Sequence, residues 1–251
     1  MATIPRAYID GMTKAVNQLS KAGQEQLAQQ LAAIDMSLPV EEVREQVIAI
    51  MQSMCGGYTD MAAMLAAEMY DGLREWELGE RMGAVAESGR VPAATDGAVR
   101  AFAQKLVDDL PEQFVTLCLE RLDYEIKRAS AETVLINGRR DQHRPHYARV
   151  PSGAETCDFC LMLASRGFVY KSLDAASHFH SGCDCRVVPS WRAYKVEGYD
   201  PTRIFDQWQA AVDARAEERA ERSGKSVDEE RKSIMATYER AATNAKKANK
   251  R

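Results

Sequence analysis

Apolar residues recur every three or four positions along most of the chain, which is the period of helices with one buried face. This pattern predicts a first helix over residues 5–34 and a second over residues 39–55, which Gly56–Gly57 would end. A third helix is predicted over residues 59–82 and would be closed by Gly83. The first third of the chain is therefore expected to be helical.

Two more helices are predicted before the pattern is lost. Residues 87–94 contain a glycine and a proline and are expected to form a loop. A short helix is predicted over residues 95–110. Pro111 suits the first turn of a longer helix that would run to residue 136, where Asn137–Gly138 would end it.

The spacing of apolar residues changes after residue 138. Residues 139–156 show no helical period, and two short strands are predicted at residues 168–170 and 186–188. Further on, Asp200–Pro201 has the form of a cap followed by a first-turn proline, and residues 226–229 have the spacing of a capping box. Two C-terminal helices should begin at these points.

The predicted fold class is therefore mainly α. We expect a helical N-terminal domain over residues 1–138 and a small α+β module of zinc type, with a basic lead-in, over residues 139–195. Residues 196–251 are expected to form C-terminal helices that end in a basic tail.

Composition places the chain among ordinary globular proteins. Its 251 residues are 45% apolar and 28% charged, and they offer ample length for a hydrophobic core. The first residues lack the basic and apolar regions of a secretory signal, and no apolar run is long enough to cross a bilayer. We therefore expect no membrane association and a reducing cytosol, where clustered cysteines are more often metal ligands than disulfides.

Charge is unevenly distributed along the chain. Residues 1–130 carry 12 Lys and Arg against 20 Asp and Glu, whereas residues 131–251 carry 21 against 17. Basic clusters bind polyanions by releasing counterions, so nucleic-acid contact is one interpretation; solvated, frayed helix ends are the other. The candidate contacts are Arg139, Arg140, Arg144, Arg149, Lys246, Lys247, Lys250 and Arg251.

Five potential metal ligands gather in the predicted module. They are Cys157, Cys160, His180, Cys183 and Cys185, in the pattern C-x2-C-x19-H-x2-C-x-C. Zinc prefers sulfur and imidazole in a tetrahedral shell, and a filled shell is structural rather than catalytic. Because five candidates compete for four positions, Cys183 or Cys185 is expected to be the spare, and His178 could replace His180.

Other interpretations of the cysteines remain open. Two disulfides would leave the histidine idle, and a redox Cys-x-x-Cys needs a βαβ setting that the pattern lacks. Cys55 and Cys118 lie in apolar helical runs and are expected to be small buried hydrophobes. A metal-dependent nuclease would need a base beside an open metal position, for which His143, His146 and His178 are the available residues.

Three runs in this region resemble one family. They are residues 149–160, RVPSGAETCDFC; residues 163–170, LASRGFVY; and residues 180–189, HSGCDCRVVP. Together they look like the signature of MuF-like minor head proteins of tailed bacteriophages, whose pattern ends in His-x-x-Cys-x-Cys and so favours His180. The resemblance covers about 40 residues.

The resemblance implies a role as well as a fold. Such a protein is a minor component of the virion, packaged inside the capsid and assembled in the host cytoplasm beside the portal protein. Its expected partners are the portal and the capsid or scaffold proteins, with packaged DNA as a further contact. The structural zinc and the expected lack of catalytic activity come from the cysteines and histidine themselves, which would fill the metal shell.

Overall fold

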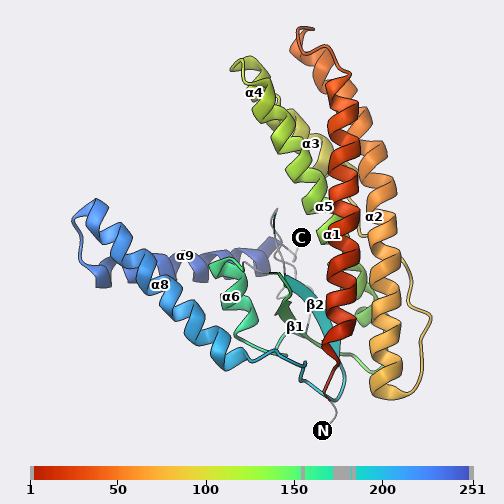
Figure 1. Ribbon diagram of the computed structural model, residues 1–251, viewed down its shortest axis with the longest axis vertical. Coiled ribbons are helices and arrows are strands. Elements are labelled where there is room, and N and C mark those ends of the chain that lie inside the picture. The colour runs from red at the N-terminus through yellow and green to blue at the C-terminus, as the bar shows by residue number, and fades with distance from the viewer. Residues whose placement is uncertain (1–2, 154–155, 172–181, 183–184, 249–251) are drawn as a thin grey trace.

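The computed structural model describes residues 3–153, 156–171, 182 and 185–248, with side chains up to position 240. The described part is mainly helical and contains one two-stranded sheet, which confirms the coarse fold prediction (Figure 1). The helices are α1 (Arg6–Ala32), α2 (Val40–Leu78), α3 (Pro92–Phe102), α4 (Gln104–Val107), α5 (Pro111–Arg140), α6 (Asp158–Ala164), α8 (Pro201–Ser223) and α9 (Val227–Ala248). The strands are β1 (His146–Pro151) and β2 (Cys185–Ser190).

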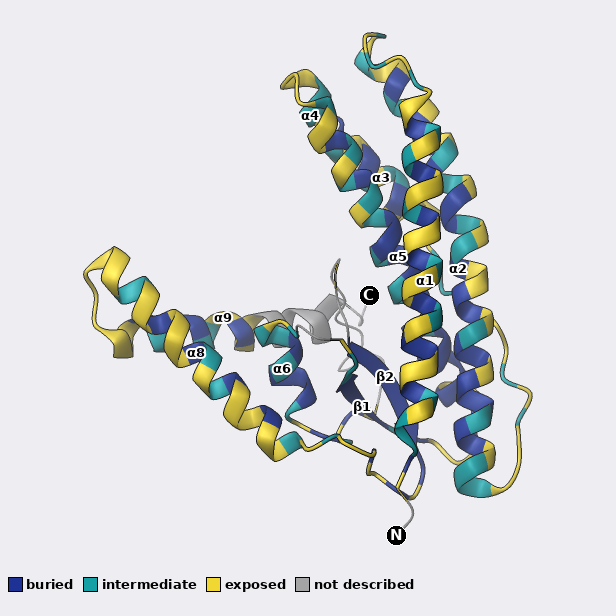
Figure 2. Ribbon diagram, viewed as in Figure 1, coloured by how far each residue is buried: buried dark blue, intermediate teal, exposed yellow. Residues whose placement is uncertain are grey.

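Helices α1, α2 and α5 run side by side as a long bundle (Figure 1). Their apolar stripes face inward, and exposed positions alternate with them on the outer surface (Figure 2). On α1 the predicted periodic positions Ile9, Met12 and Val16 are all buried. The three-to-four-residue period therefore placed the core face of this helix correctly.

The predicted break at Gly56–Gly57 is wrong, because α2 continues through both glycines to Leu78 and ends at Gly79. Buried residues stand on both sides of the pair, including Met54 and Thr59. An interior glycine costs about 1 kcal/mol relative to alanine. Packing of α2 against α1 and α5 offsets that cost, so the helix continues through the two glycines. It ends at Gly79, whose φ of +85° is the left-handed conformation of a C-terminal cap.

Two other predicted boundaries also moved. Pro92 was assigned to a loop but opens α3, where its missing N–H has no helical partner to lose. The stop at Asn137–Gly138 is wrong as well, since α5 runs to Arg140. The buried Asn137 amide accepts from the Val85 N–H and donates to the Val85 carbonyl, so its polar group is satisfied inside the helix.

Strand β1 lies in residues 139–156, where the sequence predicted no regular structure. It pairs antiparallel with β2, and the register joins His146 to Ser190 and Pro151 to Cys185. The predicted strand at residues 186–188 is confirmed within β2. Of residues 168–170 only Tyr170 pairs, as an isolated bridge to Tyr147. Both strands are largely buried, because β2 lies against the bundle and α6 packs on β1, so the polar–apolar alternation that marks a half-exposed strand is lost.

Helices α8 and α9 form a hairpin that projects away from the bundle, and α6 packs against α8 (Figure 1). Both predicted starts are confirmed. The Asp200 carboxylate accepts from the N–H groups of Thr202 and Arg203. Ser226 and Glu229 make the reciprocal hydrogen bonds of a capping box.

One buried cluster joins side chains from Ile4 to Tyr238. The division of the chain at residues 138/139 and 195/196 stays a prediction. No helix in the described part of the chain is long and apolar enough to span a membrane.

Candidate functional site

The Cys-x-x-Cys pair lies at the start of α6. Cys157 is the N-cap of this helix, and its sulfur accepts from the Cys160 N–H at 3.4 Å. A cap holds its side chain back over the first turn, so both sulfurs lie at one end of the helix. Asp158 fixes that end from outside, because its carboxylate pairs with Arg215 of α8 at 2.6 Å.

Cys185, the first residue of β2, brings a third sulfur to the same place. Its sulfur lies 3.2 Å from that of Cys160, and both side chains are buried. A tetrahedral zinc with Zn–S distances of about 2.3 Å would separate two ligand sulfurs by roughly 3.8 Å. The observed separation is about 0.6 Å shorter than that value, so a small outward shift of the two sulfurs would let them take two positions of a zinc shell.

A buried arginine lies against this pair. Arg149 of β1 is 0% exposed, and its Nε and Nη2 lie 3.2 and 2.6 Å from the Cys185 sulfur. The structure thus corrects the expectation that Arg149 contacts a polyanion, because β1 turns it into the core beside β2. A guanidinium that donates to sulfur stabilises negative charge there, and N–H donors of this kind support metal-bound thiolates.

The other two candidate ligands, His180 and Cys183, lie outside the described residues. Within the described ranges, no three His, Cys, Asp or Glu side chains form a group that could hold a metal. The sulfurs of Cys160 and Cys185 still lie 3.2 Å apart although these cysteines are 25 residues apart in the chain, and the Cys157 sulfur lies against the Cys160 N–H. The choice among His180, Cys183 and His178 stays a prediction.

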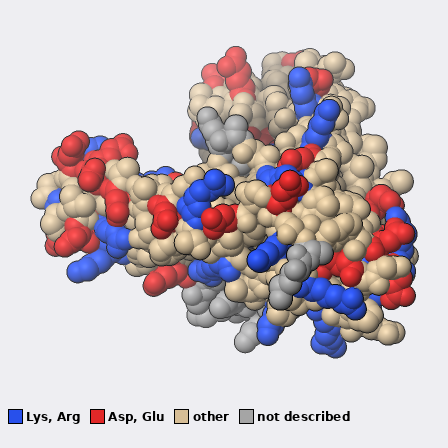
Figure 3. Space-filling model, turned by 60° about the horizontal axis from the view of Figure 1, so that its bottom comes forward, with Lys and Arg blue, Asp and Glu red and all other residues tan. Residues whose placement is uncertain are grey.

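Of the basic lead-in, Arg139 and Arg144 are exposed, with Lys171, around a small hollow. Arg140 is also exposed but pairs with Glu87 at 2.7 Å. Of the predicted tail contacts, Lys246 and Lys247 belong to α9 but their side chains are outside the described part, and Lys250 and Arg251 lie beyond it. Over the projecting α8–α9 arm, acidic and basic side chains are interspersed (Figure 3).

Of the candidate bases of a nuclease, the described residues His143 and His146 are not gathered around the cysteines. The His143 ring lies 3.9 Å from the Glu80 carboxylate, whereas the His146 ring packs against Tyr194 at 5.3 Å. His178 is outside the described residues. In the described structure these residues therefore make no shared constellation.

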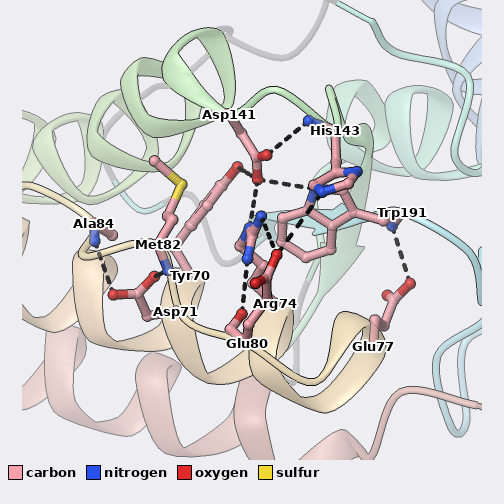
Figure 4. Close-up of polar contacts among 10 residues, drawn as sticks. All are labelled: Tyr70, Asp71, Arg74, Glu77, Glu80, Met82, Ala84, Asp141, His143 and Trp191. Atoms are coloured by element: carbon pink, nitrogen blue, oxygen red, sulfur yellow. Dashed lines mark hydrogen bonds and ion pairs between the residues drawn. The ribbon is translucent and has the colours of Figure 1, made fainter.

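Sequence reasoning missed a buried polar centre at Asp141 (Figure 4). One carboxylate oxygen accepts from the Tyr70 hydroxyl, Arg74 Nε and Trp191 Nε1, each at 3.0 Å, and the other accepts from the His143 N–H at 2.8 Å. Burial raises the pKa of Asp141, but these hydrogen bonds and the Arg74 charge outweigh it and lower the pKa. The centre ties α2 to the end of α5 and to the residue after β2.

Cys55 and Cys118 are fully buried and form no disulfide, which confirms the expectation of small core residues. Burial raises the pKa of each thiol to about 12. Such thiols stay protonated at neutral pH and are inert as ligands and nucleophiles. The reactive sulfur chemistry of the described chain is therefore confined to the α6–β2 site.

A model of one family, the VG15 protein family, matches residues 3–211, which include the bundle, the sheet, the cysteine site and the first half of α8. No curated protein and no solved structure is significantly similar to the chain.

Proposed function

We propose that the chain, which belongs to the VG15 protein family, is a minor structural protein of a tailed-bacteriophage head. It would act in capsid assembly at or near the portal and remain inside the capsid. The MuF-like runs over residues 149–189 support this role. The single observation that carries it is that Cys160 and Cys185, one from each half of the cysteine pattern, have their sulfurs 3.2 Å apart, as a structural pin requires.

The proposed pin is a zinc ion held by Cys157, Cys160 and Cys185, with a fourth ligand from His180 or Cys183. Zinc would join the start of α6 to the start of β2, two elements that the chain separates by a long connection. A metal of this kind contributes on the order of 10 kcal/mol to the folding of a small segment. A full shell of protein ligands leaves no position for substrate, so the proposal assigns no catalytic role.

The proposed partners follow from shape and charge. The long bundle carries the acidic half of the sequence, and its outer helix faces would contact portal and capsid or scaffold proteins (Figure 1). The basic residues of the second half would contact packaged DNA.

The first experiment measures the metal. We expect the full chain, purified without added metal, to hold about one zinc per chain by elemental analysis. Cys160→Ser should lose most of this zinc, because it removes a buried sulfur at the centre of the site. Cys118→Ser is the matched control, since Cys118 is equally buried but lies in α5, and its zinc content should be unchanged.

The second experiment measures the role. The chain is co-expressed with the portal protein encoded in the same genome, and association is followed by size-exclusion chromatography. We expect a complex and no cleavage of DNA by the zinc-loaded protein. DNA cleavage that His143→Ala abolishes, or the absence of any complex with portal and capsid proteins, would overturn the structural role.

A further inference from the structure

A small positively charged hollow opens on the surface where α5 ends beside β1. Its volume is about 140 Å³. The residues that line it are Leu135, Gly138, Arg139, Arg144, Pro145, Tyr147 and Lys171. Among these described lining residues three carry positive charge and none carries negative charge, so the hollow is suited to an anion.

The three cations come from three separate segments. Arg139 lies in the last turn of α5, Arg144 in the turn before β1, and Lys171 directly after the bridge residue Tyr170. Within the described part of the chain no carboxylate lies within ion-pair distance of any of them, and Arg139 is attracted to Glu132 only at longer range. The helix dipole would explain one cation at the end of α5, but it does not explain the other two.

A neutral donor completes the lining. Tyr147 is 3% exposed, and its hydroxyl lies so close to Gly138 that a Cβ at that position would overlap the oxygen. The described residues offer this hydroxyl no hydrogen-bond partner. A phenol hydroxyl donates to an acceptor where one is available, and an anion in the hollow would supply one.

The chain holds the charged residues in place by its backbone. Arg144 has a φ of +43°, which is unfavourable for a residue with a side chain, and its N–H donates to the Asp141 carbonyl at 3.2 Å. Lys171 is placed by the pairing of Tyr170 with Tyr147, whose N–H donates to the Tyr170 carbonyl at 2.8 Å.

We infer that this hollow is a binding site for one phosphate group, and that the group belongs to the backbone of nucleic acid. The hollow is smaller than the roughly 300–1,000 Å³ of metabolite pockets and holds about four or five waters at roughly 30 Å³ each. It can therefore take a small ionic group carried on a longer molecule. Arginine, lysine and tyrosine donors around one point match phosphate oxygens.

This inference rests on the proposed function, because it assigns the DNA contact of a head protein to one site. It differs from the sequence prediction in its residues. Of the basic residues that the sequence predicted to contact DNA, Arg149 and Arg140 do not line the hollow. Lys171 and Tyr147, which the sequence did not predict, do line it. Any nucleic acid would be recognised through its phosphates, so no base preference is expected.

The test uses the full chain and a fluorescent DNA duplex of about 20 base pairs, with affinity measured by anisotropy at several salt concentrations. Arg144→Gln and Lys171→Gln should each weaken binding about tenfold at low salt and reduce the slope of log affinity against log salt by about 1. Lys14→Gln is the charge-matched control on α1, an exposed lysine outside the hollow, and should change affinity less than about twofold.

A third variant separates a built site from general attraction to positive charge. Tyr147→Phe removes only the hydroxyl, so the thermal midpoint and the salt slope should be unchanged while affinity falls about threefold. Inorganic phosphate at millimolar concentration should compete with DNA for the wild type and not for Arg144→Gln.

Several results would overturn the site. These are the absence of DNA binding by the wild type, equal losses in Lys14→Gln and Arg144→Gln, or full affinity in Tyr147→Phe. If Arg144→Gln lost binding to poly-glutamate but kept its affinity for DNA, the hollow would bind an acidic protein instead of DNA. Each of these outcomes leaves the zinc content and the portal complex untouched, so failure here is distinct from failure of the proposed function.

Discussion

Replacing Asp141 by asparagine tests whether the buried polar centre holds the bundle to the sheet. The substitution would keep the shape of the side chain but remove its charge and turn one acceptor into a donor. The donors at stake are the Tyr70 hydroxyl, Arg74 and Trp191, each 3.0 Å from one oxygen. The Asp141 side chain is 1% exposed and that of Arg74 is 6%, so water does not replace the lost acceptor.

The expected loss follows from that burial. Breaking a buried ion pair by removing one partner costs about 3–5 kcal/mol, and Arg74 would keep only its pair with the exposed Glu80 carboxylate, at 3.3 Å. For a chain of this length, 1 kcal/mol shifts the thermal midpoint by roughly 2–4 °C. Asp141→Asn should therefore lower the midpoint by roughly 6–20 °C, measured by circular dichroism at about pH 7.

The control is the same substitution in an exposed pair. Asp10 lies 2.9 Å from Arg6 Nε, almost the same distance, but its side chain is 56% exposed. Asp10→Asn should cost less than about 1 kcal/mol, because solvent screens exposed pairs. Equal midpoints for Asp10→Asn and Asp141→Asn would refute the reasoning that burial sets the strength of this centre.

Two more outcomes follow from the same region. Because the hydrogen bonds lower the pKa of Asp141 below its ordinary value of 3.8, the stability it contributes is complete above about pH 4 and is lost as the pH falls through the lower folded pKa. Acid titrations of the unfolding free energy should show this loss in the wild type and not in Asp141→Asn. Gly138→Ala should cost about 1–3 kcal/mol by denaturant unfolding, since its Cβ would meet the Tyr147 hydroxyl, whereas Gly97→Ala in open space should cost nothing.

The sequence predicted the features that depend on neighbours along the chain. The buried face of α1, the Asp200 cap and the Ser226 capping box rest on spacings of two to four residues, and all are present. The same local rules failed at Gly56–Gly57, where contacts with distant helices outweigh the cost of two interior glycines. Local patterns thus placed helix faces better than helix ends.

The failures around the site have one physical cause. Strand β1 is buried, so it lacks the polar–apolar alternation that would mark a half-exposed strand. Because β1 was not predicted, Arg149 was grouped with three nearby arginines that are exposed. Composition alone does not indicate that its side chain is buried beside Cys185. Lys171 and Tyr147 were missed for the same reason, since only the pairing of Tyr147 with Tyr170 places them at the end of α5.

The cysteine site and the positively charged hollow at the end of α5 are connected through β1 and Tyr170. Tyr147 and Arg149 are two residues apart on one strand, so one side of β1 serves both sites: Tyr147 lines the hollow and Arg149 donates to Cys185. The Tyr170 hydroxyl donates to the Leu163 carbonyl of α6 at 2.8 Å, while the Tyr170 backbone pairs with Tyr147 and precedes Lys171. A metal that fixes α6 against β2 would therefore also fix the position of Lys171. The proposed zinc could therefore affect DNA binding without contacting DNA, because it would fix the segments that position Lys171 and Tyr147.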